Sequence, residues 1–247
     1  MDSASAGLAA TAWAALLFAA MFLWGSRIRP LTLLGIDSRN AISFSAGMTA
    51  AYVFVHVMPE MHGARAAFAK SVSIALRYEG MAIYFVGLLG FLMFYGLDHL
   101  RRRASASAEP EGDRTAFRIH VGGFAAYVGL IAYLLVHLLD DSPVSTALYA
   151  VAISAHFLTI DHSLREEHGA AYDNVGRYVL AATALLGWGL GQLVAVPMHV
   201  VALLVAFISG AIMMNSMITE LPSAKDGRFV PFMLGGLVYG LILLPLG

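Results

Sequence analysis

Long apolar stretches recur along the whole chain, and few polar positions interrupt them. They predict eight membrane-spanning helices, at about 8–26, 41–59, 80–99, 117–139, 144–164, 176–196, 198–219 and 229–246. Each is close to the ~20 residues with which an α-helix crosses a ~30 Å hydrocarbon core. The apolar positions do not alternate as they would in a membrane β-barrel. The sequence therefore predicts an all-α polytopic membrane protein, a bundle of eight transmembrane helices forming a single domain over residues 1–247.

The stretch 41–61 combines an apolar background with a polar stripe. The stripe consists of residues three or four positions apart, which are Ser45, Thr49, Tyr52, His56 and Glu60. This spacing places them on one side of an α-helix. An imidazole and a carboxylate at the end of a membrane helix are costly in lipid and tend to face a cavity or a partner. His56 and Glu60 are therefore candidates for a polar pathway.

Three other predicted spans also carry polar or ionisable groups. The candidate groups fall at three depths: an outer set (His56, Glu60, His137, Asp140 and Asp141), a central His156 with Tyr127, Asn215 or Gln192 as candidate companions, and an inner set (His120, Asp161, His162 and Glu220). Imidazole and carboxylate donors without thiolates suit zinc, iron or manganese. They suit a proton relay equally well.

The composition supports a membrane protein, because 59% of the 247 residues are hydrophobic and only 13% are charged. The chain has no cysteine, which excludes disulfides, thiolate metal sites and iron–sulfur clusters. A net charge of −1 and the lack of a basic patch give no reason to expect nucleic acid as a partner. No nucleophile–base–acid set and no phosphate-binding loop is evident, so an enzyme is not expected.

The positive charges set the expected orientation. With the N-terminus outside, the inner loops hold most arginines and lysines, including Arg101, Arg102 and Arg103. This bias predicts an integral protein of the bacterial inner (plasma) membrane with both termini outside the cytoplasm. The first apolar run follows Asp2 and is followed by Arg27, which is untypical of a cleavable signal peptide. The polar, small-residue-rich segment 101–116 is predicted to be a flexible cytoplasmic loop.

Three stretches resemble the ZIP family of divalent-metal transporters. His-Val-Met-Pro-Glu at 56–60 is similar to the His-x-x-Pro-Glu that ends the second ZIP helix, and Gly-Phe-Leu-Met-Phe at 90–94 resembles the end of the third. The segments 207–222, which ends in Glu-Leu-Pro, and 227–244 resemble the last two helices. The eight spans, the outward termini and a variable loop after the third span also agree. The resemblance implies a carrier that moves a divalent cation by alternating access.

The departures from the family fall at its metal site, which ZIP proteins hold between helices four and five. The fifth-helix pattern His-Glu-x-Pro-His-Glu is His-Phe-Leu-Thr-Ile-Asp at 156–161, so only His156 and the final acid, Asp161, correspond. The fourth-helix pattern His-Asn-x-x-Asp-Gly has no clear counterpart; His137 and Asp141 have similar spacing but lie at the helix end. A tight site needs four or more donors. The site is therefore either single and weak, or lost.

Three functional readings remain open. In the first, a divergent ZIP-like carrier collects a divalent cation near His56 and Glu60, binds it transiently around His156 and releases it past Asp161, His162 and Glu220. In the second, a ZIP-fold protein has lost the two-metal site and has a regulatory or other role without metal transport. In the third, two histidines ligate a haem, which the motif order disfavours. For the carrier, no tightly bound cofactor is expected, because the divalent metal cation is the substrate. The expected partners are the metal ion and the lipid bilayer, and homodimerisation is left open.

Overall fold

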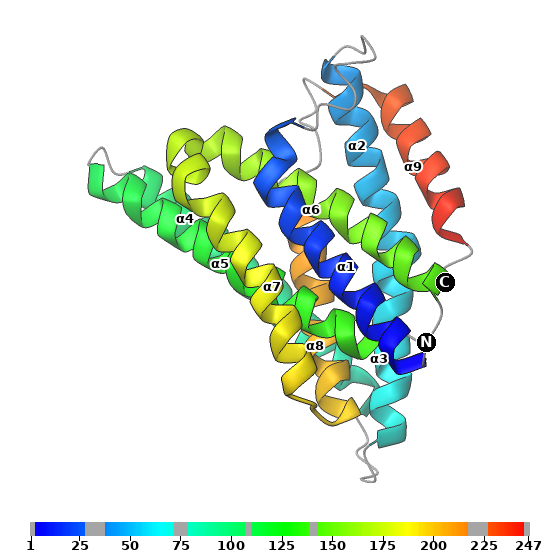
Figure 1. The fold of residues 1–247 in the computed structure, drawn as a ribbon. Helices are drawn as coiled ribbons and strands as arrows, with labels where there is room; N and C mark the ends of the chain where they lie inside the picture. Colours follow the sequence, from blue (N-terminus) through cyan, green and yellow to red (C-terminus); the bar gives the residue numbers. More distant parts are fainter. Residues whose placement is uncertain are drawn as a thin grey trace. The chain divides into compact units, whose positions relative to one another are not determined.

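The computed structural model describes residues 3–27, 38–71, 79–106, 110–138, 143–216 and 227–244 (Figure 1). Its helices are α1 (Ser3–Trp24), α2 (Ser38–Tyr52), α3 (Met58–Ser71), α4 (Glu79–Ser105), α5 (Pro110–Leu138), α6 (Pro143–Ala171), α7 (Arg177–Leu193), α8 (Met198–Asn215) and α9 (Phe229–Leu243). Short helical turns join some of them, η1 (Gly25–Arg27), η3 (Val53–Val57) and η4 (Tyr172–Gly176). No strand occurs in these described ranges, which confirms the all-α class.

Four helical segments are long and apolar enough to cross a membrane: Ala6–Arg27, Met81–Ser105, Glu111–His137 and Met198–Asn215. They correspond to four of the eight predicted spans, and α9 is an apolar but shorter helix. Large apolar side chains are exposed on α4, among them Phe85 and Leu92. A helix with such a surface is suited to contact with lipid rather than water. The described helices are thus those of a membrane protein, while the eight-span ZIP bundle stays a prediction.

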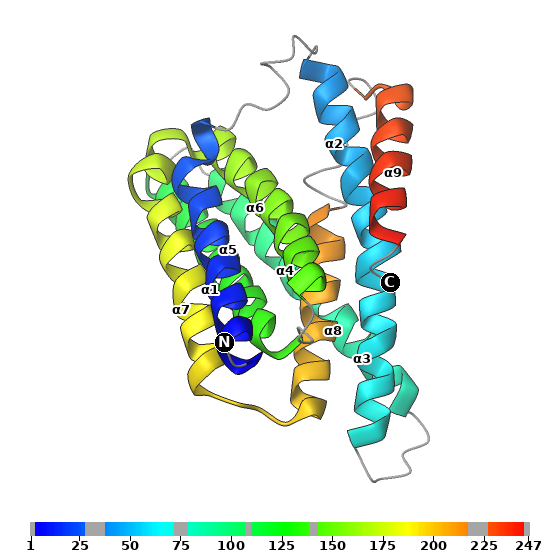
Figure 2. The same ribbon diagram turned by 45° about the vertical axis from the view of Figure 1, so that its right-hand side comes forward.

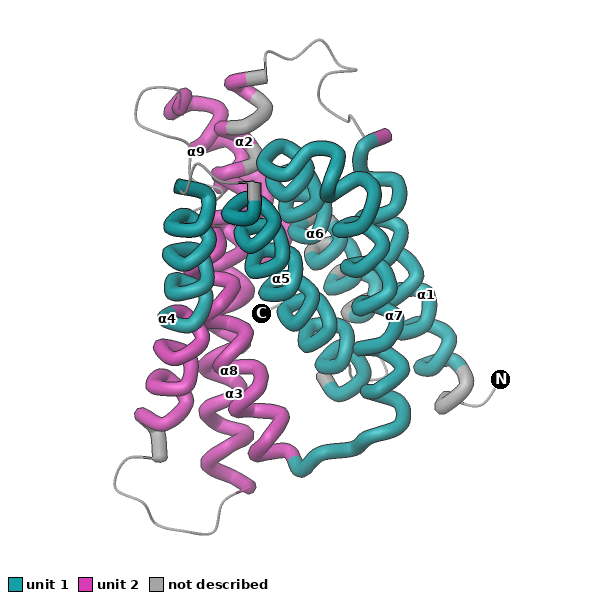
Figure 3. The backbone as a smooth tube through the Cα atoms, turned by 90° about the vertical axis from the view of Figure 1, so that its left-hand side faces the viewer, with its two compact units in different colours: residues 1–26, 92–197 teal, residues 27–91, 198–247 magenta. Residues whose placement is uncertain are grey.

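Unit 1 consists of residues 1–26 and 92–197 (Figure 3). Within it α7 packs along α5, and α1 packs against both α6 and α7. The ring of Phe157 lies 5.1 Å from that of Phe18 and 5.3 Å from that of Phe22, and all three side chains are fully buried. At Gly187, a Cβ atom would collide with the carbonyl oxygen of Gly129. Aromatic packing and one close backbone approach therefore hold this unit together.

Unit 2 consists of residues 27–91 and 198–247. In it α2 runs beside α9, and α3 packs against α8 (Figure 2). Gly47 lies so close to α9 that a Cβ atom would overlap the carbonyl oxygen of Phe232. The start of α9 is also tied to α2, because the Arg228 backbone N–H donates to the Ser43 hydroxyl at 2.9 Å. Small residues thus allow close helix contact where lipid provides little driving force for association.

The segment predicted as a flexible loop, 101–116, is mostly helical where the structure describes it. α4 continues to Ser105, because Asp98 accepts hydrogen bonds from Arg101 and Arg102 one turn ahead, at 2.7 Å each for the shortest contacts. α5 begins at Pro110 and has acidic residues in its first turn, both of which favour a helix start. The sequence-based expectation gave too little weight to these end signals.

The two glycines Gly187 and Gly189 provide a matched test of this packing. Gly187→Ala is expected to lower the free energy of unfolding by roughly 1–3 kcal/mol, because the new methyl group meets the Gly129 carbonyl. Gly189→Ala adds a methyl group where nothing lies within 4 Å, so it should be neutral or slightly stabilising. Thermal unfolding of the detergent-solubilised full chain measures both, and equal effects of the two changes would contradict the packing of α5 on α7.

Candidate functional site

His156, the predicted central ligand, is buried in α6 of unit 1. Its Nε2 atom lies 2.6 Å from the hydroxyl oxygen of Tyr127 on α5. Phe157 packs nearby, with ring centroids 6.3 Å apart. A tyrosine hydroxyl can donate to a bare imidazole nitrogen or accept from a protonated one, and in either case a metal reaches this nitrogen only by displacing the hydroxyl. The contact makes any cation site at His156 weak.

Asp161, the predicted inner acid, is buried and already paired. Arg165 donates to both of its carboxylate oxygens, at 2.9 and 3.0 Å, and the Tyr172 hydroxyl donates to Oδ1 at 2.7 Å. Arg165 also forms an ion pair with Asp173. Burial and the neighbouring carboxylate raise the pKa of Tyr172, which keeps the hydroxyl protonated as a donor. Because the Arg165 guanidinium neutralises the Asp161 carboxylate, this carboxylate offers little charge to a cation. We therefore interpret the contacts of Asp161 with Arg165 and Tyr172 as structural, and call them the Asp161 staple.

Gly169 explains why that staple can form. Its φ of 50° and ψ of −123° break the helix between His168 and Tyr172, in a region that side-chain-bearing residues rarely adopt. The chain therefore turns from α6 into η4 and brings Tyr172 back over Asp161. The guanidinium of Arg165 lies 5.2 Å from the centre of the Tyr172 ring, which adds a cation–π contact to the same turn.

His56 and Glu60 lie together in unit 2, as their spacing predicts. His56 Nε2 is 3.9 Å from Glu60 Oε2, and the two side chains are 16% and 24% exposed. The Tyr52 ring stacks on the imidazole, with centroids 5.2 Å apart. His56 falls in the π-helical turn η3, between α2 and α3. Such turns occur often at functional sites.

The remaining predicted ligands give no site in the described residues. His137 Nδ1 lies 3.2 Å from the carbonyl oxygen of Tyr133 in the preceding turn, so this nitrogen donates within its own helix. Asp140, Asp141 and Glu220 lie outside the described residues. His162 is exposed on α6.

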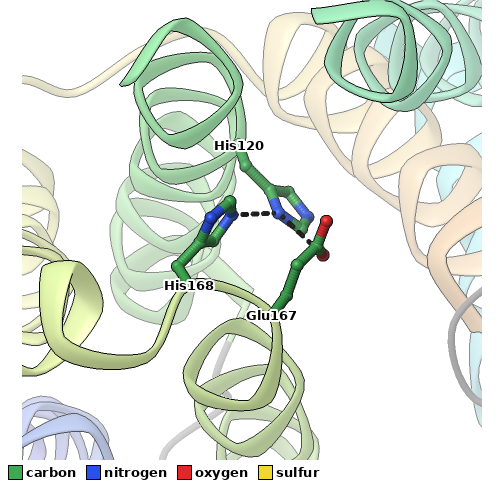
Figure 4. Close-up of side chains that lie close together, drawn as sticks. All are labelled: His120, Glu167 and His168. Atoms are coloured by element: carbon green, nitrogen blue, oxygen red, sulfur yellow. Dashed lines mark hydrogen bonds and ion pairs between the residues drawn. The ribbon is translucent and has the colours of Figure 1, made fainter. Parts of the chain in front are cut away.

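A group that sequence reasoning did not assemble lies at the end of α6 (Figure 4). It is called here the His–Glu–His cluster and consists of His120 on α5 with Glu167 and His168 on α6. His120 Nδ1 is 2.9 Å from His168 Nε2 and 3.3 Å from Glu167 Oε2. The three donor atoms lie within 4.8 Å of one another, which makes this the candidate metal group among the described residues. Burial, and secondarily the charge of Arg101, lowers the pKa of His168 and favours a neutral ring.

Only His120 of this cluster was noted from the sequence, as an inner group. Glu167 and His168 follow the predicted fifth span in the polar run Arg-Glu-Glu-His at 165–168. Their helical continuation was not expected, because 144–164 was predicted to end before them. Knowing that α6 extends to Ala171 would have placed both residues on a helix.

Comparison of the whole chain with protein-family models, with curated proteins and with solved structures finds no match. The ZIP resemblance therefore rests on the sequence motifs quoted above.

Replacing Tyr172 tests the staple on Asp161. Tyr172→Phe removes one of the donors that satisfy a buried carboxylate, so the free energy of unfolding should fall by roughly 1–3 kcal/mol. Tyr178→Phe is the matched control, since Tyr178 is exposed and its hydroxyl accepts from the neighbouring Arg177, and it should change stability by less than about 0.5 kcal/mol. Thermal unfolding compares the two, and a Tyr172→Phe protein as stable as the control would show that Asp161 does not depend on this hydroxyl.

Proposed function

We propose that this protein is a divergent ZIP-like carrier that moves a divalent metal cation, of the zinc, iron or manganese type, across a membrane. The observation that supports the proposal most is the pair of His56 and Glu60. It places an imidazole nitrogen and a carboxylate oxygen 3.9 Å apart, with the imidazole in a π-helical turn and the carboxylate in the first turn of the helix that follows. Ligand atoms ~2.1 Å from one zinc ion lie about 3.4 Å apart in a tetrahedral site. A small side-chain movement would therefore let both residues bind the same cation.

The pair is suited to collecting a cation rather than holding it. Two protein donors leave the remaining coordination positions to water, so binding is weak and exchange is fast. The carboxylate supplies the charge that offsets the loss of hydration when the cation leaves water. Both side chains keep some exposure, which provides access. In a ZIP-like carrier, rocking of helices around the bound ion would then complete transport.

Transient binding at His156 is part of the same proposal. Because its Nε2 is hydrogen-bonded to Tyr127, the cation has to replace that bond. Asp161 contributes little, since Arg165 and Tyr172 already engage its oxygens. A carrier with one weak central donor would release its cargo quickly, which fits the departures from the ZIP metal motif.

Metal uptake by proteoliposomes tests the role of Glu60. Glu60→Gln keeps the shape of the side chain and removes its charge, so uptake of zinc, manganese, iron or cobalt at low concentration should fall at least tenfold. Glu111→Gln, an exposed change in the first turn of α5, is the control and should retain uptake. Equal uptake by the two variants, at equal amounts of folded protein, would refute the carrier.

Tyr127→Phe tests whether His156 takes part. Removing the competing hydroxyl frees Nε2 at a cost of one buried hydrogen bond of about 1 kcal/mol. If a cation binds there in transit, the KM for uptake should fall roughly five- to tenfold, because 1.4 kcal/mol corresponds to a factor of ten. The control is Tyr178→Phe. An unchanged KM would make His156 a structural residue.

A second candidate function is a ZIP-fold protein that has lost the two-metal site and has a regulatory or other role without metal transport. The hydrogen bond between Tyr127 and His156 favours it, because such a bond satisfies a buried imidazole without any ligand. This second candidate predicts no uptake of any metal by the proteoliposomes, whereas the carrier predicts uptake.

A further inference from the structure

We propose that the His–Glu–His cluster is a binding site for a zinc-class divalent cation, separate from the pair of His56 and Glu60. The site lies within unit 1 and joins α5 to the end of α6. It stands on geometry alone and holds whether or not the protein is a carrier. Two imidazoles and one carboxylate form a ligand set that zinc uses with its fourth position open to water.

Two of the three distances between donor atoms fit such an ion with little movement, and all three atoms lie within 4.8 Å of one another. Tetrahedral zinc holds its donor atoms about 3.4 Å apart, and His120 Nδ1 already lies 3.3 Å from Glu167 Oε2. The two imidazole nitrogens, at 2.9 Å, need to separate by roughly 0.5 Å to reach the same spacing. Figure 4 shows the three side chains converging on one another from two helices.

The protons of the two rings also allow binding. His120 Nδ1 and His168 Nε2 share one proton in their hydrogen bond. When a metal binds, that proton moves to the other nitrogen of the same ring, and both imidazoles remain neutral ligands. The ion thus replaces a shared proton between two lone pairs, and no net proton is released.

Arg101 decides the strength and orientation of the site. It forms an ion pair with Glu167 Oε1 and donates to Asp98, while Arg102 also donates to Asp98. Outer contacts of this kind fix a ligating carboxylate, and here they leave Oε2 directed at His120. The guanidinium also repels a cation, so the site is expected to be exchangeable. Glu167 is 31% exposed, which gives the ion a route from solvent.

The imidazoles select the class of ion. Calcium and magnesium prefer oxygen ligands, while two nitrogen donors and one carboxylate favour zinc, cobalt, nickel or copper. An ion at this position would tie α5 to α6 just before the turn at Gly169. Its removal is therefore expected to loosen the same turn that Asp161 and Tyr172 hold closed.

Cobalt binding to the full chain in detergent tests the proposal. Cobalt(II) in a four-coordinate nitrogen and oxygen site gives visible absorption bands, which zinc should abolish by displacement. His168→Gln and Glu167→Gln should each lower cobalt affinity at least tenfold. The matched controls are His162→Gln and Glu166→Gln, which alter exposed neighbours on α6 and should leave the titration unchanged.

Two further measurements separate this site from the proposed function and from misfolding. The double variant His56→Gln with Glu60→Gln should keep the cobalt bands, and their loss there with retention in His168→Gln would overturn the proposal. Zinc should raise the Tm of the native chain and of Glu166→Gln but not of Glu167→Gln. Equal zinc stabilisation of Glu166→Gln and Glu167→Gln would overturn it as well.

Discussion

An ionisable side chain among apolar helices must be matched by a partner, because an uncompensated buried charge costs several kcal/mol. In unit 1 this requirement determines the arrangement of α6. Asp161 accepts hydrogen bonds from Arg165 and from Tyr172 beyond the turn, and His156 is bonded to Tyr127 on α5. The bonds from Tyr172 and Tyr127 tie α6 to η4 and α5, whereas Arg165 pairs with Asp161 within α6. The phenylalanines of α1 pack on Phe157 of α6, and Gly187 of α7 lies against α5.

The same requirement separates structural groups from ligand candidates. A carboxylate bound by a guanidinium and a hydroxyl gains little from a metal, since the metal would have to displace both. Two imidazoles that share one proton differ, because a cation satisfies both lone pairs at once. The His–Glu–His cluster is of this second kind. Its residues link α5 to the end of α6 as a hydrogen-bonded group, and we propose that they also bind an ion.

Much of the fold could be predicted from the length and period of the apolar runs, because a bilayer fixes how many such residues a helix needs. Helix ends were harder, since α4 and α6 continue into charged segments that hydropathy alone assigns to loops. The spacing of the α7 glycines could have predicted which of them face another helix. Gly187 and Gly191 are four residues apart and buried, whereas a Cβ atom at Gly189 would have nothing within 4 Å. The contact between His120 and His168 could not be predicted, because no local sequence pattern links residues 48 positions apart.

Two acids of the ZIP comparison differ in what lies one helical turn away: Glu60 belongs to a motif that resembles the family, and Asp161 is the acid kept in a motif that departs from it. Asp161 is followed by Arg165, whose guanidinium lies 2.9 Å from the Asp161 carboxylate. Glu60 is preceded by His56, a neutral donor when unprotonated, at 3.9 Å. An arginine four residues after an acid indicates that the two pair within one helix. The sequence contains this pattern at Asp161 and Arg165. Under the proposed function, a cation would meet a carboxylate already paired with a guanidinium at Asp161 and a carboxylate next to an imidazole at Glu60. We therefore infer that Glu60 is the better suited of these two acids to metal capture.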